Sequence, residues 1–368
     1  MQIAAPPVPA ERLAAHRVVA TALAVKSDAE LAELLAGGRS QGAGIGGSAV
    51  ALEVAGVTVF AKSIPLTDLE LRPENHRSTA DLFGLPTFYQ YPMGSTGFSA
   101  WRELAAHIMT ATWVLTGGFP GFPLTHHWRV LPAPPPREDA IAGEFGGIDG
   151  AVARWDGSAA VRRRLEAIVA SRACIVVFQE HIPHRLTDWL AGPEADFALA
   201  ERQLVAGAAF MRAQGFVHFD THFGNVLTDG AQVYFADFGL ATCDHFALSE
   251  AERRFLAEHR DFDLAYIATG LVAHAVDALR EDRPRREFLR AWVAGSVERP
   301  VAAPHLAALL DRYGLLVLLV LDFHDALNSG PKTHPWPAEQ VARLLSAVDI
   351  ASDAASDTAS DTAALNSR

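Results

Sequence analysis

The sequence predicts an α+β fold in which a small β-rich N-terminal part is followed by a larger helical C-terminal part. Short runs of alternating or β-branched apolar residues are concentrated before residue 180. After it, apolar residues recur at helical spacing, apart from one short hairpin. The chain has 368 residues, half of them hydrophobic, which is enough to bury a large core or two lobes that share one interface.

Residues 1–40 are expected to form a helical extension that precedes the sheet. An amphipathic helix is predicted from Ala10 to Ala24. A second helix begins at a capping box, in which Ser27 is followed three residues later by Glu30, and it stops at the next glycine pair.

The β-rich part is predicted to cover residues 41–180. Two strands, Ala49 to Val54 and Val57 to Lys62, have apolar, β-branched patterns and form a hairpin. A short strand is expected at Trp128 to Leu131, and Cys174 to Gln179 has the continuous apolar pattern of a buried strand.

Two inserts, 66–96 and 132–172, interrupt this strand pattern. A helix from Phe98 to Leu115 follows the first insert, and a basic-faced helix from Ser158 to Ser171 lies within the second. Either insert can shape an acceptor site or bind a partner. Four side chains of the first insert are expected at the surface: Arg72, His76, Tyr89 and Tyr91.

Residues 181–350 are predicted to form the helical part. A long helix is expected from about Glu194 to Ala213, and a small hairpin joins Val226–Thr228 to Gln232–Ala236. The tail 351–368 repeats Ser, Asp, Ala and Thr, a composition typical of disordered segments.

Composition excludes several classes of function. A net charge of -12 argues against general binding to nucleic acid or to anionic membranes. The two cysteines, Cys174 and Cys243, are too far apart for a CxxC pair and suit a reducing compartment. The N-terminus has no signal-peptide pattern, and the longest aliphatic run, Leu315 to Leu321, is too short to span a bilayer. We therefore expect a cytoplasmic protein.

The strongest motif is an eight-residue loop, followed after one hairpin by a three-residue turn. Phosphoryl transfer needs a carboxylate that orients the acceptor and oxygen ligands for Mg²⁺, and Asp and Asn supply these groups. The hairpin brings the two segments together. Their sequences are His218-Phe219-Asp220-Thr221-His222-Phe223-Gly224-Asn225 and Asp237-Phe238-Gly239.

These two motifs resemble the catalytic loop and metal-binding motif of the protein-kinase-like superfamily. The resemblance implies a bilobal fold, with a β-rich N-lobe and a larger helical C-lobe. It also implies that Asp220 orients or deprotonates the acceptor hydroxyl, that Asn225 and Asp237 hold Mg²⁺, and that His218 braces the loop. The alternative is a hydrogen-bonded surface turn whose carboxylates are incidental.

The same resemblance implies a strand lysine that grips the ATP phosphates and is paired with a glutamate on a helix. Lys62 ends the second predicted strand, and Glu103 lies on the helix that follows the first insert. Glu70 and Glu74 are weaker candidates for the partner. A solvated edge lysine and a solvated helix carboxylate are the alternatives.

A glycine-rich segment precedes the lysine. Gly42-x-Gly44-x-x-Gly47 has the spacing that lets backbone amides approach phosphate, and Ser48 adds a hydroxyl. Residues 36–41 show no strand pattern, so a flexible linker is the alternative interpretation.

After the buried strand, Gln179, Glu180 and His181 are expected at a hinge whose backbone groups bind adenine in relatives.

Two features distinguish branches of the superfamily. The ending His222-Phe223-Gly224-Asn225 is similar to that of aminoglycoside- and choline-phosphotransferase-like enzymes, which favours a non-protein acceptor. His222 is either a packed loop histidine or a direct participant. Asp263 resembles the aspartate with which these enzymes tie the catalytic loop to the following helix. In contrast, the sequence Asp237-Phe238-Gly239-Leu240-Ala241 resembles the form that this motif takes in Ser/Thr protein kinases.

The sequence thus predicts an ATP- and Mg²⁺-dependent kinase that transfers the γ-phosphoryl group to a hydroxyl of a small molecule or a peptide. One alternative is a pseudokinase-like binding module without turnover. Another is a nucleotidyl transferase, because a fold does not determine the chemistry. The sequence does not identify the acceptor or the oligomeric state.

Overall fold

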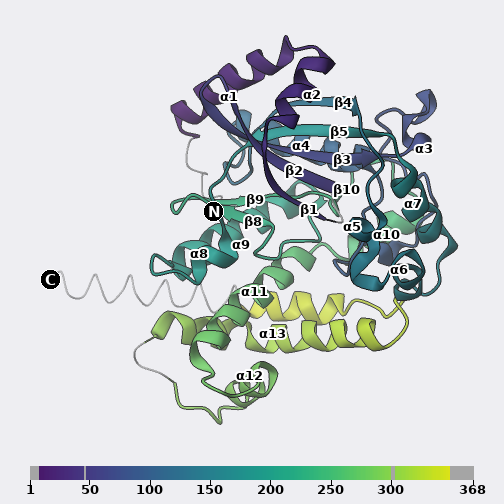
Figure 1. The fold of residues 1–368 in the computed structure, drawn as a ribbon. Helices are drawn as coiled ribbons and strands as arrows, with labels where there is room; N and C mark the ends of the chain where they lie inside the picture. Colours follow the sequence, from purple (N-terminus) through teal and green to yellow (C-terminus); the bar gives the residue numbers. More distant parts are fainter. Residues whose placement is uncertain (1–7, 45–46, 300–302, 349–368) are drawn as a thin grey trace.

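The computed structural model describes residues 8–44, 47–299 and 303–348 (Figure 1). It is a mixed α/β structure with an antiparallel sheet in its N-terminal part and a helical C-terminal part. The division of the chain at residues 180 and 181 into separate domains remains a prediction. The predicted disordered tail lies outside the described residues.

The main sheet has five strands in the order β1-β2-β3-β5-β4, and every neighbouring pair is antiparallel. Strand β5 lies between β3 and β4 and is buried, as its continuous apolar pattern predicts. The strands are β1 (Arg39–Gly44), β2 (Gly47–Val54), β3 (Val57–Leu66), β4 (Thr125–Pro132) and β5 (Ala173–Glu180).

Helices cover both faces of this sheet. Two helices, α1 (Ala10–Ala24) and α2 (Asp28–Ala36), bury Val19, Leu23 and Leu31 against one face, where Val176 and Phe178 of β5 point. Helix α4 (Ala100–Leu115) covers the other face and packs against Ile175 and Val177. The alternation along β5 therefore sends successive side chains into two cores.

Strand β1 corrects the interpretation of residues 36–41 as a linker. Its first residue, Arg39, pairs with Ala51 of β2, and a register shift follows between Ser40 and Gly42. An edge strand needs only backbone hydrogen bonds to one neighbour, and Ser40, Gln41 and Gly42 are exposed. The apolar alternation by which sequence analysis finds a strand is consequently missing.

The first insert is better packed than the sequence suggests. It contains α3 (Asp68–Leu71) and two short 3₁₀ helices, Pro73–Asn75 and Thr87–Gln90. Tyr89 and Tyr91, expected at the surface, are buried, and the Tyr91 hydroxyl lies 2.8 Å from His259 Nε2. The insert thus contacts the helical part of the chain.

The second insert forms four short elements: α5 (Glu138–Ala142), a 3₁₀ helix (Gly143–Phe145), α6 (Ile148–Arg154) and α7 (Ala159–Ala170). Only α7 is predicted from the sequence, and its basic face is partly internal. Arg164 is buried and forms an ion pair of 3.0 Å with the equally buried Glu70. This pair joins the two inserts and removes Glu70 as a candidate partner of the strand lysine.

The C-terminal part consists mainly of helices, with small two- and three-stranded sheets. The long helix and the hairpin occur in the predicted order, except that α9 begins at Phe197, because the Asp196 side chain caps it. The pairing of Phe216–Val217 with Thr242–Cys243 is not predicted, and it corrects the expectation that only helices and loops follow the hairpin. Its helices that lie wholly within the described residues are α8 (Leu186–Leu190), α9 (Phe197–Ala213), α10 (Glu250–Glu258), α11 (Phe262–Leu279), α12 (Arg285–Val293) and α13 (Pro304–Ser329). Its strands are β6 (His184–Arg185), β7 (Phe216–Val217), β8 (Val226–Thr228), β9 (Val233–Phe235) and β10 (Thr242–Cys243).

Within the described residues, α11 is long and apolar enough to cross a membrane, although half of it is buried inside the fold. Helices in the core of a globular protein can have this length and apolar composition as well.

Candidate active site

Each of the two motif segments contains one residue with a strained backbone conformation, and a side chain of α11 binds the first segment. Phe219 and Asp237 adopt φ values of 64° and 61°, which non-glycine residues rarely adopt. The Asp263 carboxylate accepts hydrogen bonds from the backbone N–H groups of His218 at 2.7 Å and Phe219 at 2.9 Å. Asp263 therefore ties the loop to the following helix, as the sequence predicts.

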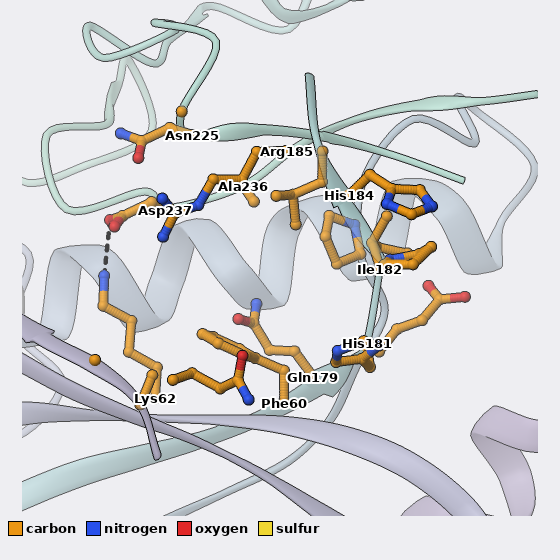
Figure 2. Close-up of a pocket in the computed structure, with 18 of the residues that line it drawn as sticks. Phe60, Lys62, Gln179, His181, Ile182, His184, Arg185, Asn225, Ala236 and Asp237 are labelled. Atoms are coloured by element: carbon orange, nitrogen blue, oxygen red, sulfur yellow. Dashed lines mark hydrogen bonds and ion pairs between the residues drawn. The ribbon is translucent and has the colours of Figure 1, made fainter. Parts of the chain in front are cut away.

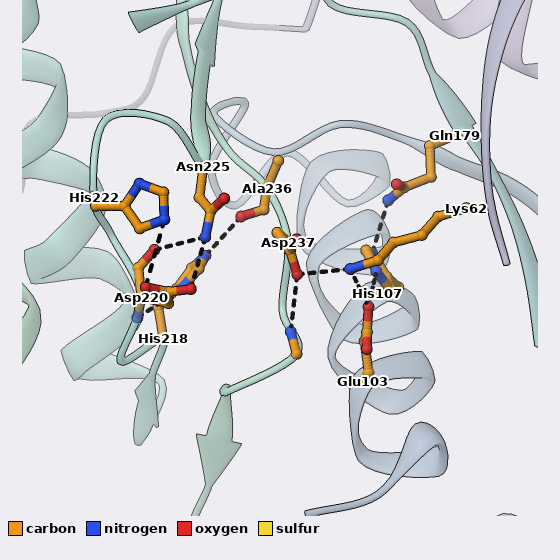
Figure 3. A network of polar contacts seen from close by, with 11 residues as sticks. Lys62, Glu103, His107, Gln179, His218, Asp220, His222, Asn225, Ala236 and Asp237 are labelled. Carbon is orange, nitrogen blue, oxygen red and sulfur yellow. Dashed lines mark hydrogen bonds and ion pairs between the residues drawn. The ribbon is translucent and has the colours of Figure 1, made fainter. Parts of the chain in front are cut away.

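His218 stabilises the loop through hydrogen bonds of its buried ring. It is fully buried, its Nε2 lies 3.0 Å from the Ala236 carbonyl oxygen, and its Nδ1 accepts from the Asp220 N–H at 3.3 Å (Figure 3). Burial lowers its pKa to about 4, so the ring is neutral at pH 7. It lines neither cavity described below, so His218 is a positioning residue in this geometry and not a residue that touches substrate.

Asp220 and Asn225 contact each other across the loop. Asn225 Nδ2 donates to Asp220 Oδ2 at 2.8 Å, which leaves the Asn225 carbonyl oxygen as the atom available to a cation (Figure 3). Burial raises the pKa of Asp220 to about 7, and the nearby Asp237 charge adds to this effect.

Lys62 joins the sheet to the second motif segment. Its Nζ lies 2.8 Å from Glu103 Oε1 (Figure 3) and 2.7 Å from Asp237 Oδ1 (Figures 2 and 3). Burial raises the pKa of Asp237, but the Lys62 ammonium outweighs it and holds the value near 2. The two carboxylates in turn raise the pKa of Lys62 despite its burial. Lysine and Asp237 are therefore both charged at pH 7.

A cavity of about 470 Å³ lies between the sheet and the C-terminal part, beside this lysine (Figure 2). Gly42, Gly47 and Ser48 line it on the sheet side, and the side-chain surroundings of Gly44 lie outside what the structure describes. All three predicted hinge residues line it as well: Gln179, Glu180 and His181. The structure thus brings seven of the predicted nucleotide-binding residues to one cavity: Gly42, Gly47, Ser48, Lys62, Gln179, Glu180 and His181.

The hinge side chains are engaged within the protein. Gln179 Nε2 lies 2.7 Å from His107 Nδ1 on α4, and the Glu180 carboxylate pairs with Arg12 of α1. The Glu180 N–H donates to the Leu124 carbonyl oxygen at 2.8 Å, so it is not available to a ligand. The Glu180 N–H is therefore not among the hinge backbone groups that could bind adenine.

A second cavity, of about 660 Å³, lies on the other side of the motif residues. Asn225 and Asp237 line both cavities, whereas Asp220 lines only the second. The two inserts supply part of the lining of this cavity, through residues 92–96, Glu144, Phe145 and Arg154. None of these residues is predicted from the sequence to be a site residue.

His222 sits at the rim of this second cavity. Its Nδ1 accepts from the Gly224 N–H at 3.1 Å, which leaves the proton on Nε2, 3.7 Å from Asp220 Oδ1. Its side chain is half exposed, which disagrees with the alternative of a packed loop histidine.

Comparison of the chain with models of known protein families finds no match, and comparison with curated proteins finds none either.

Proposed function

We propose that this protein is a phosphotransferase of the protein-kinase-like superfamily with a bilobal fold, which moves the γ-phosphoryl group of Mg-ATP to a hydroxyl acceptor. One observation carries this proposal. Asn225 and Asp237 line both cavities, with Lys62 in the first and Asp220 in the second. A phosphoryl donor in one cavity and an acceptor in the other would meet at these residues.

The first cavity fits a nucleotide. Lys62 supplies a fixed positive charge for phosphate oxygens, and the junction after β5 supplies backbone groups for a base. An amide oxygen and a carboxylate, from Asn225 and Asp237, are ligands that Mg²⁺ prefers. When bound, the ion would supply charge neutralisation at the phosphates.

Asp220 would receive the proton of the acceptor hydroxyl and orient the oxygen for attack on the γ-phosphorus. The bond to the β–γ bridging oxygen would break, and ADP would leave with that oxygen. Most of the rate would come from positioning and from charge stabilisation by Lys62.

The inserts favour a small-molecule acceptor over a protein chain. A methyl group added at Gly97 would lie 2.2 Å from the Gly239 carbonyl oxygen, and one at Gly94 would lie 2.1 Å from the Phe145 ring. The loop 92–97 is therefore packed tightly against both the second motif segment and the second insert. This loop closes off the space beside Asp220, whereas a peptide acceptor would need an open groove there.

Thermal unfolding with ATP, with Mg²⁺ and with both together is the first test. A ligand that binds only the native state at about 100 times its dissociation constant adds about 2.7 kcal/mol to stability. A rise in Tm that requires both components supports the proposal. No response to either would favour the pseudokinase-like alternative.

The mass of the product then separates the chemistries, with hydroxyl-bearing metabolites as the trial acceptors. A gain of phosphate supports a kinase, and a gain of nucleotide would show the nucleotidyl transferase instead.

A further inference from the structure

The N-terminal helix α1 sends one arginine into the junction between the sheet and the helical part. Arg12 is 8% exposed, and its guanidinium grips the Glu180 carboxylate with Nε at 2.8 Å from Oε1 and Nη2 at 2.7 Å from Oε2. Its Nη1 also donates to the Pro120 carbonyl oxygen at 2.9 Å, and its Nη2 donates to that of Phe122. A surface ion pair does not have this many partners.

The same contacts connect three segments that are distant in sequence. Glu180 ends β5, and its Oε2 accepts from the Leu124 N–H at 3.0 Å. The Arg12 guanidinium also lies over the ring of Tyr234 in β9, 5.0 Å from its centroid. One side chain of the N-terminal extension thus holds the end of β5, the segment before β4 and the hairpin that leads to Asp237.

Glu180 lines the first cavity, so the charge on its carboxylate matters for any ligand there. Among the described residues, Arg12 is its only ion-pair partner. Without that guanidinium, a partly buried negative charge would face the site proposed for a nucleotide that is itself strongly anionic. Leaving one member of such a pair uncompensated is costly.

We propose that Arg12 is a positioning residue that sets the affinity for the nucleotide, by neutralising Glu180 and by fixing the junction at which the nucleotide binds. This inference rests on the proposed function. It assigns a role to the N-terminal extension, which the catalytic motifs leave unexplained.

Arg12→Met keeps the length of the side chain and removes its charge. We expect KM for ATP to rise by about tenfold or more, with kcat changing far less, because the reacting groups are untouched. Arg12→Lys restores the charge but not the forked geometry, so it should recover only part of the affinity.

Arg17→Met is the matched control. Arg17 lies on the same helix, is exposed, and forms no ion pair among the described residues. Its substitution should leave KM for ATP unchanged.

The second substitution, Glu180→Gln, distinguishes a charge effect from loss of packing. In Arg12→Met/Glu180→Gln the unpaired charge is gone, and the glutamine oxygen can still accept from Leu124. We expect this double variant to bind ATP much more tightly than Arg12→Met, with Glu180→Gln alone completing the cycle. Equal KM values for Arg12→Met and the double variant would contradict the charge argument.

The two proposals fail in different ways. If the wild-type protein shows neither an ATP–Mg²⁺ shift in Tm nor turnover, the proposed function is wrong. If the wild type binds ATP and Arg12→Met has an unchanged KM, the role of Arg12 is wrong and the proposed function stands. Should Arg12→Met not fold, Arg12→Lys and the double variant provide the same comparison.

Discussion

Asp220 and Asp237 have the same side chain but opposite electrostatic environments. Asp237 contacts the Lys62 ammonium, and its pKa is held near 2. Among the described residues no lysine or arginine forms an ion pair with Asp220, and burial raises its pKa to about 7. The proposed cation ligand is thus charged at pH 7, whereas the pKa of the proposed base is close to the pH at which a general base works best.

Asp220→Asn tests the role of the base. We expect kcat to fall by more than about 100-fold, because general-base catalysis is lost while the geometry is kept. The asparagine oxygen can still accept from Asn225, so Tm and its rise with Mg-ATP should change little. Measurements of turnover and of unfolding check this, and an active variant would remove Asp220 from the proposed mechanism.

Asp263 shows how one residue can determine the shape of the loop without contact with either cavity. It is buried and accepts two backbone N–H groups. Asp263→Ala should lower the free energy of unfolding by about 2 to 5 kcal/mol, because two buried donors lose their acceptor. Urea unfolding measures this cost.

Asp277→Ala on the same helix is the control, because its ion pairs with Arg280 and Arg285 are largely exposed and should contribute less than about 1 kcal/mol. Equal losses for the two variants would show that the backbone contacts of Asp263 are not important for stability.

At the scale of elements, β1 and β2 place glycines beside the first cavity. Gly47 has a φ of 113°, and a Cβ there would lie 2.0 Å from the Ser63 carbonyl oxygen of β3. Gly42 has a φ of 120° but open space around it. Gly47 is therefore required by both conformation and close approach, whereas Gly42 is required by conformation alone.

Gly47→Ala should consequently destabilise the protein and weaken ATP binding more than Gly42→Ala does. Gly56→Ala, in the turn between β2 and β3, is a control with positive φ, open space and no contact with the cavity. Tm and KM for ATP report the two effects separately. An equal response of Gly42→Ala and Gly47→Ala would show that the contact with Ser63 is relieved by a shift of the strand.

At the scale of the whole molecule, buried histidines dominate the expected response to acid. Burial lowers their pKa values to between about 3 and about 4, far below the ordinary value of 6.5; these are His126, His218, His259 and His324. Two carboxyls, of Asp220 and Asp263, act oppositely, since burial raises their pKa values to about 7. Four histidines outweigh two carboxyls.

Between pH 6.5 and about 4 the unfolded chain thus binds more protons than the folded chain, so stability falls as pH falls. We expect Tm to be lower at pH 5 than at pH 7. His126→Asn should weaken this dependence, and His245→Asn, whose side chain is 77% exposed, should leave it unchanged. A Tm that is constant or rises toward pH 5 would contradict the prediction.

Local patterns of the sequence were sufficient for most elements of the fold. Helix α1 and the capping box of α2 occur where the pattern predicts them, and β5 is a buried strand, as predicted. The residues with charged or amide groups in the candidate site were also found from the sequence, because motif spacing places Asp220, Asn225 and Asp237 around one short hairpin.

The tertiary structure alone decided what depends on distant contacts. Arg12 and Glu180 are 168 residues apart, and no local pattern distinguishes Arg12 from Arg17 on the same helix. The cavity beside Asp220 is likewise lined by residues of two inserts, none of which is predicted from the sequence to lie at the site. Backbone propensity and apolar spacing act over a few residues, so they determine elements; buried ion pairs and cavity walls depend on how those elements pack, which only the folded chain specifies.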